Sequence, residues 1–123
     1  DNSIDGGPII SQMKFKIRRN HNAQENYIRL MNTAVKLFKC KIEDIIDGNY
    51  KSTPQDDKLA GKYYDRKSVD YKTIKSMVVK PYNLETHNKL RALIFPAFQY
   101  PIVNGREVKR SLYKNGKFIC EYV

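Results

Sequence analysis

Residues 23–47 have the sequence AQENYIRLMNTAVKLFKCKIEDIID, and this stretch decides the fold of the chain. Apolar side chains recur in it every three or four positions, which places them on one face of a helix. That face consists of Tyr27, Met31, Ala34, Phe38, Ile42 and Ile45, with Ile28, Val35 and Ile46 beside them. Because glycine readily takes the left-handed conformation that ends helices, Gly48 marks the stop. We therefore predict a long amphipathic helix from Ala23 to about Asp47, with its apolar face turned toward a core.

The segment before this helix has a different period. From Ile10 to Ile17 the residues alternate, so that Met13, Phe15 and Ile17 share one face while Lys14 and Lys16 share the other. A period of two is typical of a β-strand with one face in water. We predict a strand here.

A second helix is expected after Pro81. Asn83 can cap its start, and Leu84, Leu90 and Leu93 are spaced to face inward, with His87 on or near that face. Proline residues then exclude a helix from the stretch between Phe95 and Pro101.

The last third of the chain has two hairpin signals, Asn104-Gly105 and Asn115-Gly116. They delimit three short strands, at about 99–103, 106–113 and 117–122. The chain is thus predicted to be α/β, with a strand and a long helix followed by a second helix and a small antiparallel β-meander.

Composition restricts the possible functions. The 123 residues have 23 Lys and Arg against 13 Asp and Glu, so the formal net charge is +10. This charge favours an anionic partner such as nucleic acid or a nucleotide, although a solvated lysine-rich surface explains it as well. No apolar run has the length of a membrane helix, so we expect no membrane partner. Cys40 and Cys120 are expected to be free thiols in a reducing cytoplasm, and we find no metal-ligand spacing.

Asp5 is the candidate acid/base group. It lies in a loop with the sequence IDGGPII at residues 4–10, where Ile4 and Ile9 can partly remove water and so raise a carboxyl pKa. An aspartate that only bonds its own turn is the alternative interpretation. The adjacent Gly6 and Gly7 would let a ligand approach the backbone closely.

This loop resembles that of the enzymes that transfer a formyl group from 10-formyltetrahydrofolate. Their loop has a second aspartate followed by Gly-Gly-Pro, then a strand and a long helix, in the order found here. Further along, Tyr63-Tyr64-Asp65-Arg66-Lys67 resembles the family's aromatic and basic stretch, and Arg91-Ala92 before Phe95-Pro96 resembles its second helix and proline. The short, hairpin-rich tail is most similar to the sugar N-formyltransferases that act on dTDP-linked 4-amino-4,6-dideoxy sugars.

The resemblance implies an enzyme and a set of roles. Asp5 would be catalytic, Gly6 and Gly7 would bind the folate co-substrate, and no metal would be needed. The residues expected to bind the nucleotide sugar are Tyr64, Arg66 and Lys67 at the diphosphate and Phe98 and Tyr100 at the base and sugar. In this family the catalytic Asn and His precede the loop, so the chain would be the C-terminal half of the enzyme. The resemblance also implies a cytoplasmic enzyme of surface polysaccharide (lipopolysaccharide O-antigen) biosynthesis.

The resemblance also implies a division of the chain and an assembly. Residues 1–50 would end the formyltransferase catalytic domain, which has a Rossmann-like fold, and residues 51–123 would form a C-terminal subdomain. The terminal strands would join two copies into a homodimer. Two other classes stay open: a basic RNA-binding module, such as a methionyl-tRNA formyltransferase-like protein, and a non-catalytic dimerisation fragment. Because the lysines are scattered along the chain, we expect no nucleic acid partner.

Overall fold

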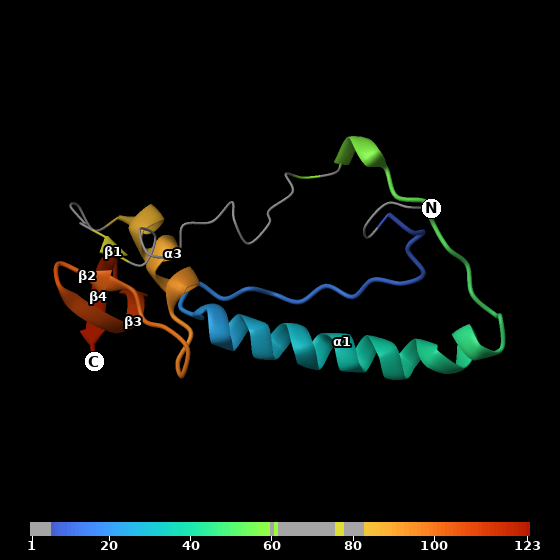
Figure 1. Ribbon diagram of the computed structural model, residues 1–123, viewed down its shortest axis with the longest axis horizontal. Coiled ribbons are helices and arrows are strands. Elements are labelled where there is room, and N and C mark those ends of the chain that lie inside the picture. The colour runs from blue at the N-terminus through green and yellow to red at the C-terminus, as the bar shows by residue number, and fades with distance from the viewer. Residues whose placement is uncertain (1–5, 60, 62–75, 78–82) are drawn as a thin grey trace. The chain divides into compact units, whose positions relative to one another are not determined.

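The computed structural model describes residues 6–59, 61, 76–77 and 83–123 (Figure 1). Within them the fold is α/β, as the sequence predicts. The chain divides into two compact units, of which the first contains residues 1–15 and 29–64 and the second contains residues 16–28 and 65–123.

Helix α1 spans Ala23–Ile46, within a residue of the predicted bounds. Its start is a reciprocal cap, in which the amide of Glu25 donates to Asn22 Oδ1 at 2.9 Å and the amide of Asn22 donates to Glu25 Oε2 at 2.8 Å. Its end is followed by Gly48 with φ of +71°, the left-handed conformation expected there.

The apolar face of α1 is only partly covered by the described residues: Ile42 and Ile45 are half-buried, and residues 8–11 line a cavity together with Phe38 and Ile45. No residue of α1 is buried, and several of its large apolar side chains are about half exposed or more. They are Tyr27, Ile28, Leu30, Met31, Val35, Phe38 and Ile46. The sequence predicts this face to be core, and in the structure much of it stays exposed because the described residues cover only part of it.

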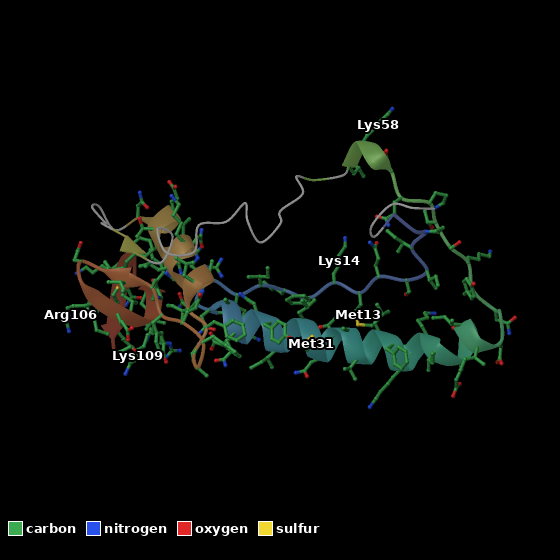
Figure 2. All side chains as sticks on the ribbon, viewed as in Figure 1. Met13, Lys14, Met31, Lys58, Arg106 and Lys109 are labelled. Carbon is green, nitrogen blue, oxygen red and sulfur yellow. The ribbon has the colours of Figure 1, made fainter. Side chains whose placement is uncertain are left out.

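Residues 10–17 alternate in exposure but form no strand. Met13 and Phe15 are half-buried while Lys14 and Lys16 are exposed, and Figure 2 shows Met13 and Lys14 pointing to opposite sides of the segment. Ile17 departs from the pattern, with 57% of its surface exposed. The prediction of a strand is therefore wrong for the described structure: the period of two is present, but no neighbouring strand completes a hydrogen-bonded ladder.

Helix α3, Leu84–Leu93, belongs to the second unit. Asn83 caps it as predicted, because its Oδ1 accepts a hydrogen bond from the amide of Thr86 at 2.9 Å. Leu90 and His87 are buried, whereas Leu84 is half exposed and so does not face inward as predicted.

The sheet of the second unit has the order β1-β2-β3-β4, with β1 parallel to β2 and the other pairs antiparallel. The strands are β1 (Ser76–Met77), β2 (Ile102–Val103), β3 (Arg106–Lys114) and β4 (Lys117–Tyr122). Both hairpins form where predicted, and both have two turn residues with positive φ, which matches the twist of the strands. These are Asn104 and Gly105 at +49° and +79°, and Asn115 and Gly116 at +51° and +73°.

The core of the second unit is small. It consists of Leu90 and Ile94 from α3 and its end, with Val103 from β2 and Val108 from β3. Tyr100, Cys120 and Tyr122 pack against this cluster. Figure 1 shows α3 against the sheet, which is the arrangement that buries these side chains.

Candidate functional site

The predicted site residues divide into two groups. Asp5, Tyr64, Arg66 and Lys67 lie outside the described residues. Among those described, Gly6 and Gly7 belong to the first unit, and Phe98 and Tyr100 belong to the second.

The glycine loop is tied to the segment after α1. Gln55 Nε2 donates to the backbone oxygen of Gly7 at 2.7 Å, and Ile9 and Thr53 exchange two backbone hydrogen bonds at 2.8 and 2.9 Å. A Cβ added at Gly7 would meet no atom within 4 Å, so the space beside its backbone is open. This geometry fits the close approach of a flat ligand to the loop.

Phe98 is presented to solvent by a tight turn. The amides of Phe98 and Gln99 both donate to the backbone oxygen of Phe95, at 3.0 and 2.9 Å, and the amide of Phe95 donates back to Gln99 at 3.0 Å. The turn closes because Ala97 adopts φ of +71°, a left-handed conformation that costs energy for any residue with a Cβ. It leaves 82% of the Phe98 surface exposed.

Phe98 also lines an apolar cavity of about 520 Å³ in the second unit, which we call the aromatic pocket. Its lining residues are Gln24, Tyr27, Ile28, Phe95, Phe98 and Gln99. The ring of Phe95 stands between two others, with its centroid 5.8 Å from that of Tyr27 and 5.3 Å from that of Phe98. This volume is within the range of pockets for small molecules.

Tyr100 has a different environment. It is half-buried against the core cluster and lines a second cavity of about 260 Å³, together with Ala97, Phe98, Gln99 and Glu107. The structure thus brings Phe98 and Tyr100 to neighbouring cavities of one unit.

The sequence did not point to Gln24, Gln99 or Tyr27 as site residues. Tyr27 lay on the apolar face of the helix, and only the docking of the first turns of α1 beside the 95–99 turn makes it a pocket wall. The sequence does not identify the two glutamines as pocket residues, because nothing in the local pattern shows which backbone atoms their side-chain amides bind.

Both histidines of the chain lie among the described residues, and neither ring lies free in solvent. His87 is buried, with Nδ1 2.8 Å from Ser111 Oγ and Nε2 2.8 Å from the backbone oxygen of Arg19, so it is the near-core residue that the sequence predicts. His21 lies in a turn, its amide bonded to the Arg18 oxygen at 3.2 Å. Its ring is not solvent-facing as expected, because Nδ1 is buried without a partner among the described residues.

Charge is distributed unevenly between the two units. The first unit contains eight Lys and Arg against seven Asp and Glu, and the second contains fifteen against six. Almost the whole cationic excess therefore belongs to the unit that contains the aromatic pocket. Such an excess attracts an anionic ligand to this unit.

The described residues contain no group of three or more potential metal-binding side chains. No helix among them combines the length and apolarity needed to cross a membrane.

Comparison with known proteins gives matches only among solved structures. No protein-family model and no curated protein matches the chain. An N-formyltransferase from Helicobacter canadensis, crystallised with folinic acid and dTDP-3-aminofucose, is 32% identical, with a TM-score of 0.80 over 94% of this chain. WlaRD, a sugar 3N-formyltransferase crystallised with dTDP and 5-N-formyl-THF, is 33% identical, with a TM-score of 0.80 over 94% of this chain.

A third structure shares the fold. A 4-N formyltransferase from Francisella tularensis has a TM-score of 0.66 over 100% of this chain at 20% identity, and this chain covers 47% of it. This chain spans 42% and 41% of the other two. The resemblance inferred from the sequence is confirmed: the chain is related in sequence and fold to part of the sugar N-formyltransferases.

Proposed function

We propose that this chain is the C-terminal part of an enzyme that transfers a formyl group from 10-formyltetrahydrofolate to the amine of a dTDP-linked amino sugar. The observation that supports this most strongly is the identity of about one third with two sugar N-formyltransferases over 94% of the chain. The loop at Asp5-Gly6-Gly7-Pro8 agrees with it, since it resembles the loop that bears a catalytic aspartate in this family.

In the proposed reaction, the sugar amine attacks the formyl carbon. A carbon–nitrogen bond to the sugar forms, and the bond between the formyl carbon and the folate nitrogen breaks. The amine loses one proton and the folate nitrogen gains one. Asp5 is the proposed acceptor of the amine proton, directly or through the histidine that the family places before this loop.

The remaining predicted residues have roles in binding. Gly6 and Gly7 would leave room for the folate, which agrees with the open space beside Gly7. Tyr64, Arg66 and Lys67 would bind the diphosphate, because guanidinium, ammonium and hydroxyl groups donate well to phosphate oxygens. Phe98 and Tyr100 would offer flat surfaces to the base and the sugar.

The predicted position of the amine on the sugar has to be revised. The sequence pattern favours a 4-amino sugar, but the two structures with one-third identity are described with a 3-aminofucose and as a 3N-formyltransferase. The 4-N enzyme has only 20% identity. We therefore propose a dTDP-3-amino-3,6-dideoxyhexose as the first substrate to test.

The exposed apolar face of α1 supports the proposal that catalysis needs a further layer of protein. We propose that the catalytic Asn and His belong to that layer and that it covers Met31, Val35 and Phe38. Residues 1–50 would then complete the catalytic domain and residues 51–123 form the C-terminal subdomain.

The proposal also includes an oligomeric state, a cellular location and a biosynthetic role. Because β4 stands at the edge of the sheet, its outer side is suited to pairing with a second copy. We propose a homodimer through this strand, in a cytoplasmic enzyme of surface polysaccharide biosynthesis. Sedimentation of the full-length protein tests the dimer, which a monomer at micromolar concentration would contradict.

The experiment that tests the substrate supplies the full-length protein with 10-formyltetrahydrofolate and, in parallel, dTDP-3-amino and dTDP-4-amino sugars of matched stereochemistry. Mass spectrometry of the products follows the formyl group. We expect kcat/KM to be at least about ten-fold higher for the 3-amino sugar, a ratio typical of one well-placed contact. A preference for the 4-amino sugar would reverse the revision and leave the enzyme class intact.

A further inference from the structure

We propose that Gln55 is a positioning residue for the glycine loop, which it holds by a hydrogen bond to the backbone oxygen of Gly7. The inference rests on the proposed function for the identity of the ligand that approaches this loop, a reduced folate. It gives a role to a side chain outside the predicted site residues, in the segment that follows α1.

The glycine loop and the segment after α1 pair in an antiparallel sense. Ile9 and Thr53 form an isolated antiparallel bridge, in which they exchange two backbone hydrogen bonds of 2.8 and 2.9 Å. In an antiparallel ladder the hydrogen-bonded pairs recur at every second residue, so the next such pair would be Gly7 with Gln55. The bridge does not extend to this pair. Here the Gln55 side chain donates from Nε2 to the Gly7 oxygen at 2.7 Å, so a side chain continues the attachment that the backbone begins.

Two prolines favour this attachment. Pro8 follows Gly7 and Pro54 follows Thr53. A residue before proline is restricted to extended backbone conformations, which are the conformations that an antiparallel bridge requires. The prolines themselves fall between the two hydrogen-bonded pairs, where the ladder needs no N–H from either chain. The sequence on both sides is therefore suited to holding the loop at this place.

The backbone that bears Gln55 is held on both sides. Thr53, two residues earlier, is fixed by the bridge. Asp56, the next residue, begins a turn in which its Oδ1 accepts from the amide of Lys58 at 3.0 Å and its backbone oxygen accepts from the amide of Leu59 at 2.9 Å. Because this backbone is already ordered, the Gln55 side chain loses only its own rotamer freedom when it bonds the loop.

Holding Gly7 has consequences for the chemistry of the loop. Gly6 and Gly7 lack a Cβ, so an unrestrained pair would take many backbone conformations. The bond to the Gly7 oxygen selects among them, while the space beside Gly7 stays open to a ligand. Asp5, the proposed proton acceptor, precedes Gly7 by two residues in the sequence. Since a misplacement of about 1 Å can cost about a hundred-fold in rate, we expect Gln55 to affect both folate binding and kcat.

Three variants of the full-length protein test this inference. Gln55→Met keeps the length of the side chain but removes the donor, Gln55→Lys retains a donor, and Gln12→Met is a control at an exposed glutamine of the same unit. Calorimetry with folinic acid should show binding about five- to ten-fold weaker in Gln55→Met. Gln55→Lys should stay within about three-fold of the wild type, and Gln12→Met should match it. A Gln55→Met protein with wild-type affinity for folinic acid would overturn the proposal.

A second ligand distinguishes positioning of the loop from a general loss of stability. The affinity for dTDP should be unchanged in all three variants, because Phe98 and Tyr100, the described residues proposed to contact the sugar nucleotide, belong to the other unit. Destabilisation of the whole protein would weaken both ligands alike and lower the temperature of thermal unfolding. Equal losses of folinic acid binding in Gln55→Met and Gln55→Lys would also contradict the proposal, because the donor would then not be the group that matters.

Formyl transfer measured on the same preparations separates this inference from the proposed function. At saturating substrates we expect kcat to fall about ten-fold in Gln55→Met and to recover in Gln55→Lys. Formyl transfer and folinic acid binding that Gln55→Met leaves unchanged would refute the positioning role and leave the function standing. Folinic acid binding that depends on a donor at position 55, in a protein without formyl transfer, would support the role of Gln55 and refute the function.

Discussion

The Nε2 atom of His87 lies 2.8 Å from the backbone oxygen of Arg19, and its Nδ1 lies 2.8 Å from Ser111 Oγ. Since the carbonyl oxygen accepts, Nε2 must bear a proton, and this buried ring joins α3 to β3 and to the turn before α1. Other bonds hold the same turn. Tyr113 exchanges two hydrogen bonds with the Asn20 side chain, at 2.8 and 3.3 Å, and Arg91 Nη1 donates to the oxygens of Arg18 and His21.

The first prediction concerns this buried bridge. His87→Ala should lower the free energy of unfolding by about 3 kcal/mol, because it leaves the buried Ser111 hydroxyl and the part-buried Arg19 carbonyl without this partner and opens a cavity. Ser111→Ala should cost about 1 kcal/mol, since it removes one of the two bonds. Urea unfolding measures both, and equal losses for the two variants would contradict the bridge.

Lys89→Ala provides a control on the same helix. Lys89 Nζ lies 2.6 Å from Glu85 Oε1, and this hydrogen bond holds the pKa of Glu85 below its usual value. A carboxyl group whose pKa is lower in the folded state than in the unfolded state stabilises the fold at pH values above its unfolded-state pKa. This contribution is lost as the pH falls through its folded-state pKa. Because both side chains are exposed, we expect a rise in the Glu85 pKa by NMR titration but no measurable change in stability.

The second prediction concerns the turn that presents Phe98. Ala97→Val should destabilise the protein by about 1–2 kcal/mol, because a β-branched residue tolerates the left-handed conformation worse than alanine does. Ala97→Gly removes the Cβ strain and should be about 0.5 kcal/mol more stable, after the larger entropy of the unfolded glycine is subtracted. Thermal unfolding compares the pair. If both variants lose the same stability, the strain at Ala97 is not the cause.

The third prediction tests the β3–β4 hairpin. Gly116→Ala should cost about 1 kcal/mol from backbone strain alone, since φ is +73° and an added Cβ would meet nothing within 4 Å. Gly61→Ala is the matched control, because its Cβ would also meet open space and its φ is not positive. A loss as large in Gly61→Ala would show that the turn conformation at Gly116 is not responsible.

The elements with local signals were predictable from the sequence. Gly48 and the apolar spacing gave the limits of α1, Asn83 gave the start of α3, and Asn-Gly pairs gave both hairpins. In each case the deciding interaction lies within a few residues of the signal, so no knowledge of the rest of the fold is needed.

The parts that depend on distant partners were not predictable in the same way. The alternation at Met13 and Phe15 is that of a strand, but a strand also needs a neighbour to bond. The aromatic pocket needs Gln24, near the start of α1, and Gln99, in the turn after α3, to line the same cavity. Alanine has no conformational preference for positive φ, so the sequence does not predict the left-handed conformation of Ala97. Asp5, Tyr64, Arg66 and Lys67 lie outside the described residues, so their roles stay predictions.

The fourth prediction concerns Asp5, the proposed catalytic residue. Asp5→Asn in the full-length protein should lower kcat at least about a hundred-fold, because the amide cannot accept the amine proton. The KM for the amino sugar should stay within a few-fold, since the substitution removes a proton acceptor and keeps the shape of the loop. Steady-state kinetics with the amino sugar varied separates the two. An unchanged kcat would refute the role of Asp5.

The most direct test of the proposed function is formyl transfer itself. Full-length protein is mixed with 10-formyltetrahydrofolate and a dTDP-3-amino-3,6-dideoxyhexose, and the sugar nucleotide is analysed by mass spectrometry. We expect a product in which one amine hydrogen is replaced by a formyl group, formed in proportion to enzyme and nearly absent with Asp5→Asn. An unmodified sugar, across both 3-amino and 4-amino substrates and with folded protein, would contradict it.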